Sequence, residues 1–196
     1  MPPKDKGKEK GTAPRDDSIL FFYMPNEPNG EFCQWYPSPF SVSKSTIDSL
    51  LAYDPQPSTT PSSDEVIHFT CAEQFMMYCK AGRFHDTVTQ RKVLATPDPK
   101  TQKRLGKAVT GFWDQPWDEV KSDVVIAGNM AKFGQGAKLR EKLLATGDKM
   151  LAEAARRDRV WGIGFNAEEA LGFREEWGEN LLGKALMVVR GRLRAE

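Results

Sequence analysis

The sequence is poor in the residues that bind metal ions and carries almost no unbalanced charge. It contains two histidines, His68 and His85, and three cysteines among 196 residues. Because these side chains are few and lack metal-type spacing, we expect no zinc site, no other metal and no cofactor. The chain has 28 basic and 27 acidic residues, for a formal net charge of +1. This balance argues against broad electrostatic capture of nucleic acid or of an anionic membrane.

The sequence also lacks the features that identify a membrane protein or a common enzyme class. No apolar run approaches the length of a membrane-spanning helix, and the charged N-terminus contains no signal-peptide core. We therefore expect a cytoplasmic or nuclear protein with no membrane partner and with reduced cysteines. No P-loop, strand–GxGxxG–helix unit, GxSxG turn or HExxH helix occurs. Short motifs thus leave the function open.

The composition of the chain changes after residue 17. Residues 1–17 are charged, rich in proline and glycine, and almost without apolar side chains, so burial cannot offset the entropy of ordering them. We predict a disordered tail over residues 1–17 and one domain over residues 18–196, long enough for a substantial core. The run of prolines, serines and threonines at residues 55–63 predicts a polar surface loop.

Short strands are predicted in the N-terminal third, and helices after it. Residues 18–23, 40–43 and 65–69 have the apolar character of strands, and residues 31–36 fit either a strand or an extended aromatic loop. Residues 44–52 fit one or two turns of helix. Strands followed by helices indicate an α+β fold, here a mainly α-helical single domain with a few short strands.

Helix boundaries are indicated by prolines, glycines and capping residues. Thr70-Cys71-Ala72-Glu73 matches a capping box, in which Glu73 would bond back to the start of its own helix. Residues 150–154 fit either a strand or the start of a helix. The other helices predicted are 72–82, 83–95, 99–110, one from Pro116 to Gly134–Gly136, one through Leu139–Leu144 closed by Gly147, and a last one capped by Asn180.

One segment, residues 156–164, departs from the helical periodicity around it. It combines Asp158, Trp161, Gly162 and Gly164. Glycine lets the backbone approach another group closely, and tryptophan offers a flat apolar face with one N–H donor. Taken alone, the pattern is more typical of a glycine-rich turn around a core tryptophan than of a binding loop.

Two further clusters have residues that a core does not need. Glu73 and Lys80 are seven positions apart, so they lie on nearly the same helix face, roughly 10 Å apart along the axis at ~1.5 Å per residue. Lys132, Phe133 and Gln135 stand at a predicted helix end, where Lys132 could hold a phosphate. Taken alone, these patterns are more typical of a capping box and of lysines that offset helix dipoles.

Aromatic residues could also form a platform for a nucleobase. Gln34-Trp35 and Trp117 are candidates for such contacts, although tryptophans of this kind more often belong to the core.

The order of these landmarks resembles the YbiA-like, or NADAR, superfamily over about residues 18–194. One departure concerns a family histidine, which is Gln74 here, so a titratable group is missing at that position. The resemblance is carried by Phe21-Phe22, Gln34-Trp35, Thr70–Phe75, Lys80-Ala81, Leu105–Lys107, Trp117, Lys132-Phe133, Leu144–Gly147, Leu151–Ala154, Asp158–Gly164 and Asn180–Met187.

The resemblance implies a small helix-rich fold and N-glycosidase activity without a cofactor. Members of the family cleave the bond between a ribose and an amino nitrogen. Some act on ribosylated pyrimidine intermediates of riboflavin synthesis, and others remove ADP-ribose from guanine in nucleic acid. By the family pattern, Glu73, Asp158 and Trp161 match functional positions, Trp117 matches a pocket aromatic residue, and Lys80 is a candidate for Schiff-base chemistry.

The resemblance therefore leads to the expectation of an ADP-ribosyl hydrolase acting on ADP-ribosylated guanine. The alternatives are an N-glycosidase of riboflavin intermediates and a non-catalytic module that binds ADP-ribose. The expected catalytic residues are Glu73, Lys80 and Asp158. The expected substrate-binding residues are Gln34, Trp35, Trp117, Lys132, Phe133, Gln135, Trp161, Gly162, Gly164 and Asn180, with the two glycines presenting backbone N–H groups to the diphosphate.

Overall fold

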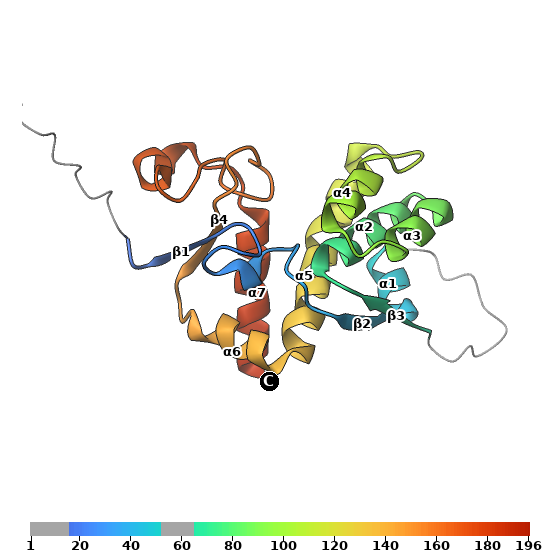
Figure 1. The fold of residues 1–196 in the computed structure, drawn as a ribbon, viewed down its shortest axis with the longest axis horizontal. Coiled ribbons are helices and arrows are strands. Elements are labelled where there is room, and N and C mark those ends of the chain that lie inside the picture. Colours follow the sequence, from blue (N-terminus) through green and yellow to red (C-terminus); the bar gives the residue numbers. More distant parts are fainter. Residues whose placement is uncertain (1–15, 52–64) are drawn as a thin grey trace, which may run out of the picture.

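The computed structural model describes residues 16–51 and 65–196 (Figure 1). The loop predicted at residues 55–63 and most of the tail predicted at residues 1–17 lie outside these ranges. Within the described ranges, no helix is both long enough and apolar enough to span a membrane.

The described residues form a mainly helical α+β fold with short strands, which confirms the predicted class. The strands are β1 (Ile19–Phe22), β2 (Phe40–Ser43), β3 (Val66–Phe69) and β4 (Met150–Glu153). The α-helices are α1 (Lys44–Leu50), α2 (Ala72–Arg83), α3 (Thr87–Leu94), α4 (Pro99–Lys107), α5 (Asp114–Gln135), α6 (Ala137–Ala145) and α7 (Leu181–Ala195). Two 3₁₀ helices are η1 (Gly30–Phe32) and η2 (Ala170–Glu176).

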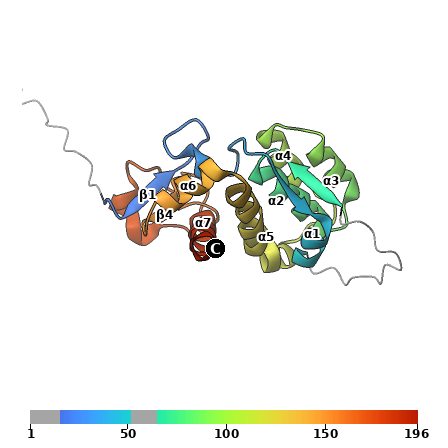
Figure 2. The same cartoon turned by 90° about the horizontal axis from the view of Figure 1, so that it is seen from below.

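The long helix α5 lies between two halves of the molecule. One half contains β1, β4, α6 and α7, and the other contains α1–α4 with β2 and β3, as Figures 1 and 2 show from two directions. Helix α5 packs against α2 on one side and α7 on the other. Its apolar side chains, including the fully buried Val124 and Phe133, join both halves into one main core.

The strands form two separate pairs. β2 and β3 pair antiparallel, with Phe40 opposite Phe69. β1 and β4 pair in parallel, with Ile19 opposite Met150 and Phe22 opposite Glu153. Parallel pairing requires a long connection between the strands. Most of the chain, including α2 and α5, supplies this connection. The ambiguous segment 150–154 is therefore a strand, and its partner is the first strand of the chain.

Helix α7 holds the end of β4 in place. Asn180, just before α7, has left-handed backbone geometry, and its side chain makes no capping bond to α7. Instead, its Oδ1 accepts from the backbone N–H of Glu153 at 3.1 Å, and its Nδ2 donates to the Leu151 carbonyl at 2.9 Å. Asn180 is thus the N-cap residue of α7, as predicted, but its side-chain amide satisfies strand backbone instead of the first turn of the helix.

The capping box predicted at the start of α2 does not form, so this prediction is wrong. The cap position is Cys71, and it makes no side-chain capping bond. The side chain of Gln74, rather than Glu73, reaches back, and its Oε1 accepts from the backbone N–H of Thr70 at 2.7 Å. Its Nε2 donates to the Val93 carbonyl at 3.0 Å, which ties α2 to the end of α3. The carboxyl group of Glu73 is therefore not used as a cap.

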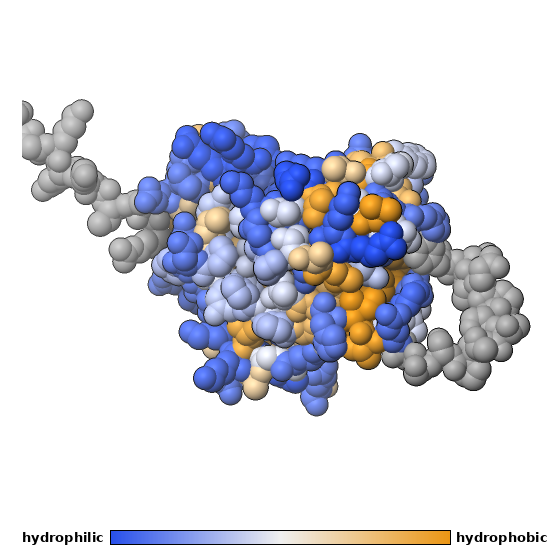
Figure 3. Space-filling view, turned by 45° about the vertical axis from the view of Figure 1, so that its right-hand side comes forward, coloured by the Kyte–Doolittle hydropathy of each residue, from blue (hydrophilic) through white to orange (hydrophobic). Residues whose placement is uncertain are grey.

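Other predictions differ only locally from the structure. Residues 31–36 contain the end of η1 followed by a loop rather than a strand. Helix α5 begins at Asp114, two residues before Pro116. On the face shown in Figure 3, apolar residues gather toward the right-hand side and hydrophilic residues cover the upper left.

The close contact between α7 and β4 can be tested at Gly183. A Cβ there would lie 2.0 Å from the Leu151 carbonyl oxygen and 2.5 Å from Asn180. Gly183→Ala should lower the free energy of unfolding, although alanine is the better helix former. Gly191 of the same helix has nothing within 4 Å of its ideal Cβ, so Gly191→Ala should stabilise by up to about 1 kcal/mol. Chemical denaturation measures both variants, and equal effects would contradict this packing.

Candidate functional site

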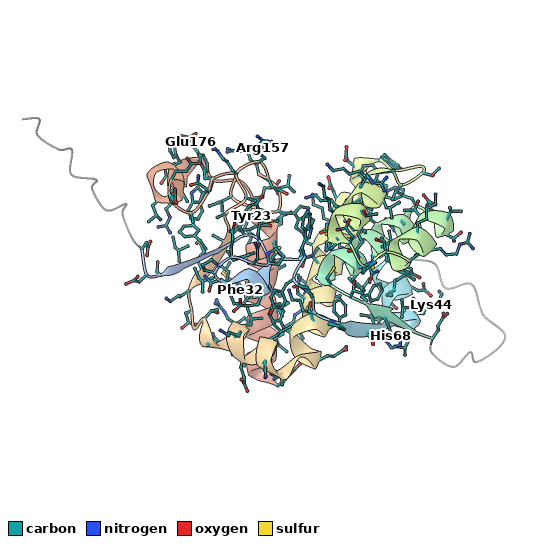
Figure 4. All side chains as sticks on the ribbon, viewed as in Figure 1. Tyr23, Phe32, Lys44, His68, Arg157 and Glu176 are labelled. Carbon is teal, nitrogen blue, oxygen red and sulfur yellow. The ribbon has the colours of Figure 1, made fainter. Side chains whose placement is uncertain are left out.

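A cavity of about 340 Å³ opens between the two halves of the molecule. Figure 4 labels Arg157 and Tyr23 on the half that contains β1 and β4, and both line this cavity. The lining residues are Tyr23, Met24, Cys33, Gln34, Trp35, Glu73, Met76, Met77, Lys80, Lys103, Gly106, Lys107, Trp117, Glu153, Ala155, Arg157, Asp158, Trp161 and Leu182.

One wall of the cavity is built by the ends of β1 and β4. Because these strands are parallel, their carboxyl ends lie at the same edge. Tyr23 follows β1, Glu153 is the last residue of β4, and Asp158 follows β4 by five residues. All three side chains line the cavity. The strand pairing thus brings the two ends of the chain to a single site.

The opposite wall is built by α2, α4 and the first turn of α5. Glu73 lies in the first turn of α2 and Lys80 in its last turn, and both line the cavity, as the seven-residue spacing predicted. Lys103 comes from α4, which packs against α2. Trp117 comes from the start of α5 and is 6% exposed.

Glu73 is a buried carboxyl group in a charged setting. Burial raises the pKa of Glu73 to about 7, and the nearby Asp158 adds to this effect. Lys103 and Lys80 oppose it, as does a hydrogen bond from the Trp35 side chain. The carboxyl group can therefore exchange protons near neutral pH, as general acid–base catalysis requires.

Glu153 is a second such carboxyl group, and we did not include it among the predicted site residues. Burial, followed by the charges of Asp158 and Glu73, raises the pKa of Glu153 to about 8, while Lys103 opposes the change. Its Oε2 is shielded from solvent and has no hydrogen-bond partner among the described residues. In the sequence, Glu153 could be recognised only as a carboxylate at the end of an apolar strand. That recognition depends on identifying residues 150–153 as a strand.

Asp158 is both part of a turn and part of the cavity wall. Its Oδ1 accepts from the backbone N–H groups of Val160 at 3.0 Å and Trp161 at 2.8 Å. The turn interpretation of this stretch was therefore correct, and the turn also directs Trp161 into the cavity. Trp161 packs against the main core and is half-buried.

Lys80 is a partly buried amine in the wall of the cavity. Its Nζ lies 3.8 Å from the centre of the Phe112 ring and 6.0 Å from that of Trp117. Burial lowers the pKa of Lys80, while Asp114 and Glu73 oppose the effect. A larger fraction of the amine is then neutral and nucleophilic than for an exposed lysine.

The thiol of Cys33 also lines the cavity, but it is a poor nucleophile. Burial raises its pKa to about 11, and only the thiolate form attacks readily. The described residues contain no group of three or more His, Cys, Asp or Glu that could hold a metal ion.

Gln34 and Trp35 line the cavity and belong to a loop that hydrogen bonds from buried polar side chains hold in place. Asn129 Nδ2 donates to Gln34 Oε1 at 3.0 Å. Lys132 is 1% exposed, and its Nζ donates to the Cys33 carbonyl at 2.9 Å. Lys132 is not among the residues that line the cavity, and its hydrogen bond fixes this loop.

Five more of the predicted substrate-binding residues lie outside the cavity lining, whereas Trp117 and Trp161 belong to it. The five are Phe133, Gln135, Gly162, Gly164 and Asn180. Phe133 is fully buried in the main core, and Gln135 bonds the backbone of Ser41. A Cβ on Gly162 would lie 2.8 Å from the Glu153 carbonyl oxygen, and Gly164 has a φ of +83°. Gly162 thus packs the loop against β4, as Asn180 does, whereas Gly164 packs against the Arg159 side chain within the loop.

The cavity also has basic residues that the sequence prediction did not include. Lys103, Lys107 and Arg157 line it together with the three carboxyl groups. Lys103 lies 5.9 Å from the Trp35 ring centre and lowers the pKa of both Glu73 and Glu153. Nothing in the periodicity of α4 indicates this role, because basic residues at a helix end usually face solvent.

Comparison with known proteins gives matches along most of the chain. Residues 21–194 match the NADAR domain family. An N-glycosidase of Acanthamoeba polyphaga mimivirus is 35% identical over 179 residues, which cover 89% of this chain and 95% of that protein. A riboflavin biosynthesis protein of Vibrio vulnificus is 29% identical over 174 residues, which cover 89% of this chain and 38% of that protein.

A solved structure has the same fold. The NMR structure of the Escherichia coli protein YbiA superposes with a TM-score of 0.66 at 24% identity, covering 95% of this chain and 90% of that chain.

Proposed function

Since the chain belongs to the NADAR domain family, we propose that it is an N-glycosidase that hydrolyses the bond between a ribose and an exocyclic amine. We further propose that its substrate is ADP-ribosylated guanine, from which it removes ADP-ribose. The viral relative is named an N-glycosidase, which supports the reaction class. The proposal rests on one observation of the cavity, which places carboxyl groups of raised pKa beside a lysine of lowered pKa.

The chemistry of the substrate explains why this combination is useful. A ribose attached to an exocyclic amine can open its ring to an imine, because the nitrogen lone pair can form a second bond to C1′. A neutral Lys80 amine can then attack C1′ and displace the base as a free amine, leaving a Schiff base between lysine and sugar. Water adds to this Schiff base, and its collapse releases the sugar and restores the amine.

The other cavity residues have roles that fit this sequence of steps. Glu73, near its own pKa at neutral pH, moves protons between the attacking and departing nitrogens. Asp158 binds ribose hydroxyl groups, and Trp117 and Trp161 stack on the base or exclude water. Lys103, Lys107 and Arg157 provide the positive charge that a diphosphate requires. A direct displacement that uses carboxylates alone would leave Lys80 without a role.

A second candidate substrate is a ribosylated aminopyrimidine phosphate of the riboflavin pathway. It is favoured by the Vibrio vulnificus relative, whose name assigns it to riboflavin biosynthesis. Both substrates contain a ribose on an exocyclic amine and a phosphate on the ribose, so both fit the same lining residues.

Released sugar distinguishes the two substrates. The protein should release ADP-ribose from an ADP-ribosylated guanine oligonucleotide faster than it releases ribose phosphate from the ribosylaminopyrimidine phosphate. Chromatography of the products measures both rates. Faster release of ribose phosphate than of ADP-ribose would instead identify the ribosylaminopyrimidine phosphate as the substrate. Binding of ADP-ribose without turnover of either substrate would show a binding module instead of an enzyme.

The Schiff-base step predicts a covalent adduct on Lys80. Borohydride added during turnover should reduce the imine and fix the sugar on this residue, as peptide mass spectrometry would show. Lys80→Met keeps the apolar stem against Phe112 but removes the amine, and should lower turnover by at least about 100-fold. Lys92→Met, at an exposed position on α3, is the matched control and should retain turnover. Near-normal turnover of Lys80→Met without an adduct would reject the step.

Asp158 has a structural and a chemical role that two substitutions separate. Asp158→Asn keeps an oxygen for the N–H groups of Val160 and Trp161, so the turn should form and the melting temperature should stay close to that of the wild type. Its turnover should nevertheless fall by about 100-fold, because the charge is lost. Asp158→Ala should lose both turnover and some stability. If Asp158→Asn retains full turnover, the carboxylate has no part in the reaction.

A further inference from the structure

We propose that Glu153 is the general acid of the cavity: it is held as a neutral carboxylic acid and gives its proton to the ribose ring oxygen, while Glu73 works as the proton-transferring carboxylate. This assignment rests on the proposed N-glycosidase function and adds a catalytic residue to it. The family resemblance marks Glu73, and not Glu153, as a functional position.

The backbone of Glu153 is fixed on three sides. The residue pairs with Phe22 across the β1–β4 sheet, its N–H donates to Asn180 Oδ1, and its carbonyl accepts from Ile163 at 2.9 Å. A side chain at this position belongs to the wall of the cavity. The position of its carboxyl group is therefore set by the sheet rather than by a mobile loop.

The surroundings of the carboxyl group favour its neutral form. The residue is half-buried, yet Oε2 is shut off from solvent and has no partner among the described residues. An ionised oxygen in that position would be a buried charge without a hydrogen bond, which is costly. A protonated carboxyl group avoids this cost and carries a hydrogen that it can donate.

Glu73 differs from Glu153 in the groups that stabilise a negative charge. Glu73 receives a hydrogen bond from Trp35 and faces two cations, Lys103 and Lys80. Glu153 faces Asp158 from its own loop and Glu73 from α2, and the charge of Lys103 from α4 opposes them. Burial and neighbouring carboxylates raise the pKa of both groups, to about 8 for Glu153 and about 7 for Glu73. The hydrogen bond from Trp35 favours the ionised form of Glu73, whereas Oε2 of Glu153 has no partner among the described residues, so the two groups are suited to opposite roles.

The proton balance of the reaction is complete with this assignment. The Glu153 proton moves to the ring oxygen as the C1′–O bond breaks, and the exocyclic nitrogen lone pair becomes the second C1′–N bond. Lys80 attacks C1′, and Glu73 passes a proton from the lysine nitrogen to the exocyclic nitrogen, which departs as a free amine. Water then adds to the Schiff base and returns a proton to Glu153. The hydroxyl proton of the adduct moves to the lysine nitrogen as the sugar aldehyde is released.

The protonation of Glu153 can be tested without measuring activity. With the folded pKa at about 8 and the ordinary value at 4.5, the folded state holds a proton that the unfolded state has lost. Stability of the wild type should therefore fall as pH rises through this window. Glu153→Gln removes this titration. Its melting temperature relative to wild type should rise by at least about 2 °C between pH 5 and pH 8.

The control for this measurement is Glu175→Gln, which changes an exposed glutamate in η2. Its melting temperature relative to wild type should stay constant over the same pH range. A constant difference for Glu153→Gln as well would overturn the proposal, because Glu153 would then be ionised in the folded protein.

Turnover tests the acid role directly. Glu153→Gln should fold normally and lose about 100-fold in kcat on the substrate that the wild type cleaves. The wild-type rate should decline above about pH 8, where Glu153 loses its proton, and this decline should disappear in Glu153→Gln. Glu153→Asp, which still carries a proton, should recover part of the rate. Wild-type kcat and an unchanged pH profile in Glu153→Gln would overturn the proposal.

The two proposals fail in different ways. If the wild type cleaves neither ribosylamine substrate, the proposed function fails and the catalytic role of Glu153 fails with it, even where the stability measurements show a protonated side chain. If the wild type is active and Glu153→Gln is equally active, only the assignment of the acid fails.

Discussion

The parallel pairing of β1 with β4 is the interaction on which the site depends. It joins residues 19–22 to residues 150–153, so that segments from the two ends of the chain meet at one edge of the cavity. A two-stranded sheet of four residues a strand is marginal by itself. Helix α7 stabilises it through the close approach at Gly183 and the side-chain bonds of Asn180. Gly183 and Asn180 thus hold the end of β4, and with it the backbone of Glu153.

The charged groups of the cavity lower the stability of the folded protein. Three carboxyl groups share it, and two of them are buried enough to have raised pKa values. Such an arrangement opposes folding at neutral pH, and proteins retain it where titration near neutral pH is useful. The basic residues Lys80 and Lys103 offset part of this repulsion. The same burial that limits stability raises the pKa of Glu73 and Glu153 and lowers that of Lys80.

Several buried polar residues that could be taken for ligand-binding residues make hydrogen bonds within the protein instead. Lys132 holds the loop before Trp35 by one bond to the Cys33 carbonyl, and Gln74 joins α2 to the end of α3. As a neutral amide, Gln74 bonds the backbone on both sides without titrating. A buried polar side chain must find hydrogen-bond partners, and this requirement accounts for these residues without a ligand.

The sequence by itself determined the mainly helical class, most helix positions, and the shared face of Glu73 and Lys80, because these follow from local periodicity and capping. It could not decide that residues 150–153 form a strand, because their partner lies at the other end of the chain. It therefore missed Glu153, and it missed Lys103 because the packing of α4 on α2 is equally non-local. Only the tertiary structure separated Asp158 and Trp161, which line the cavity, from Lys132 and Asn180, whose hydrogen-bonding groups are used within the protein.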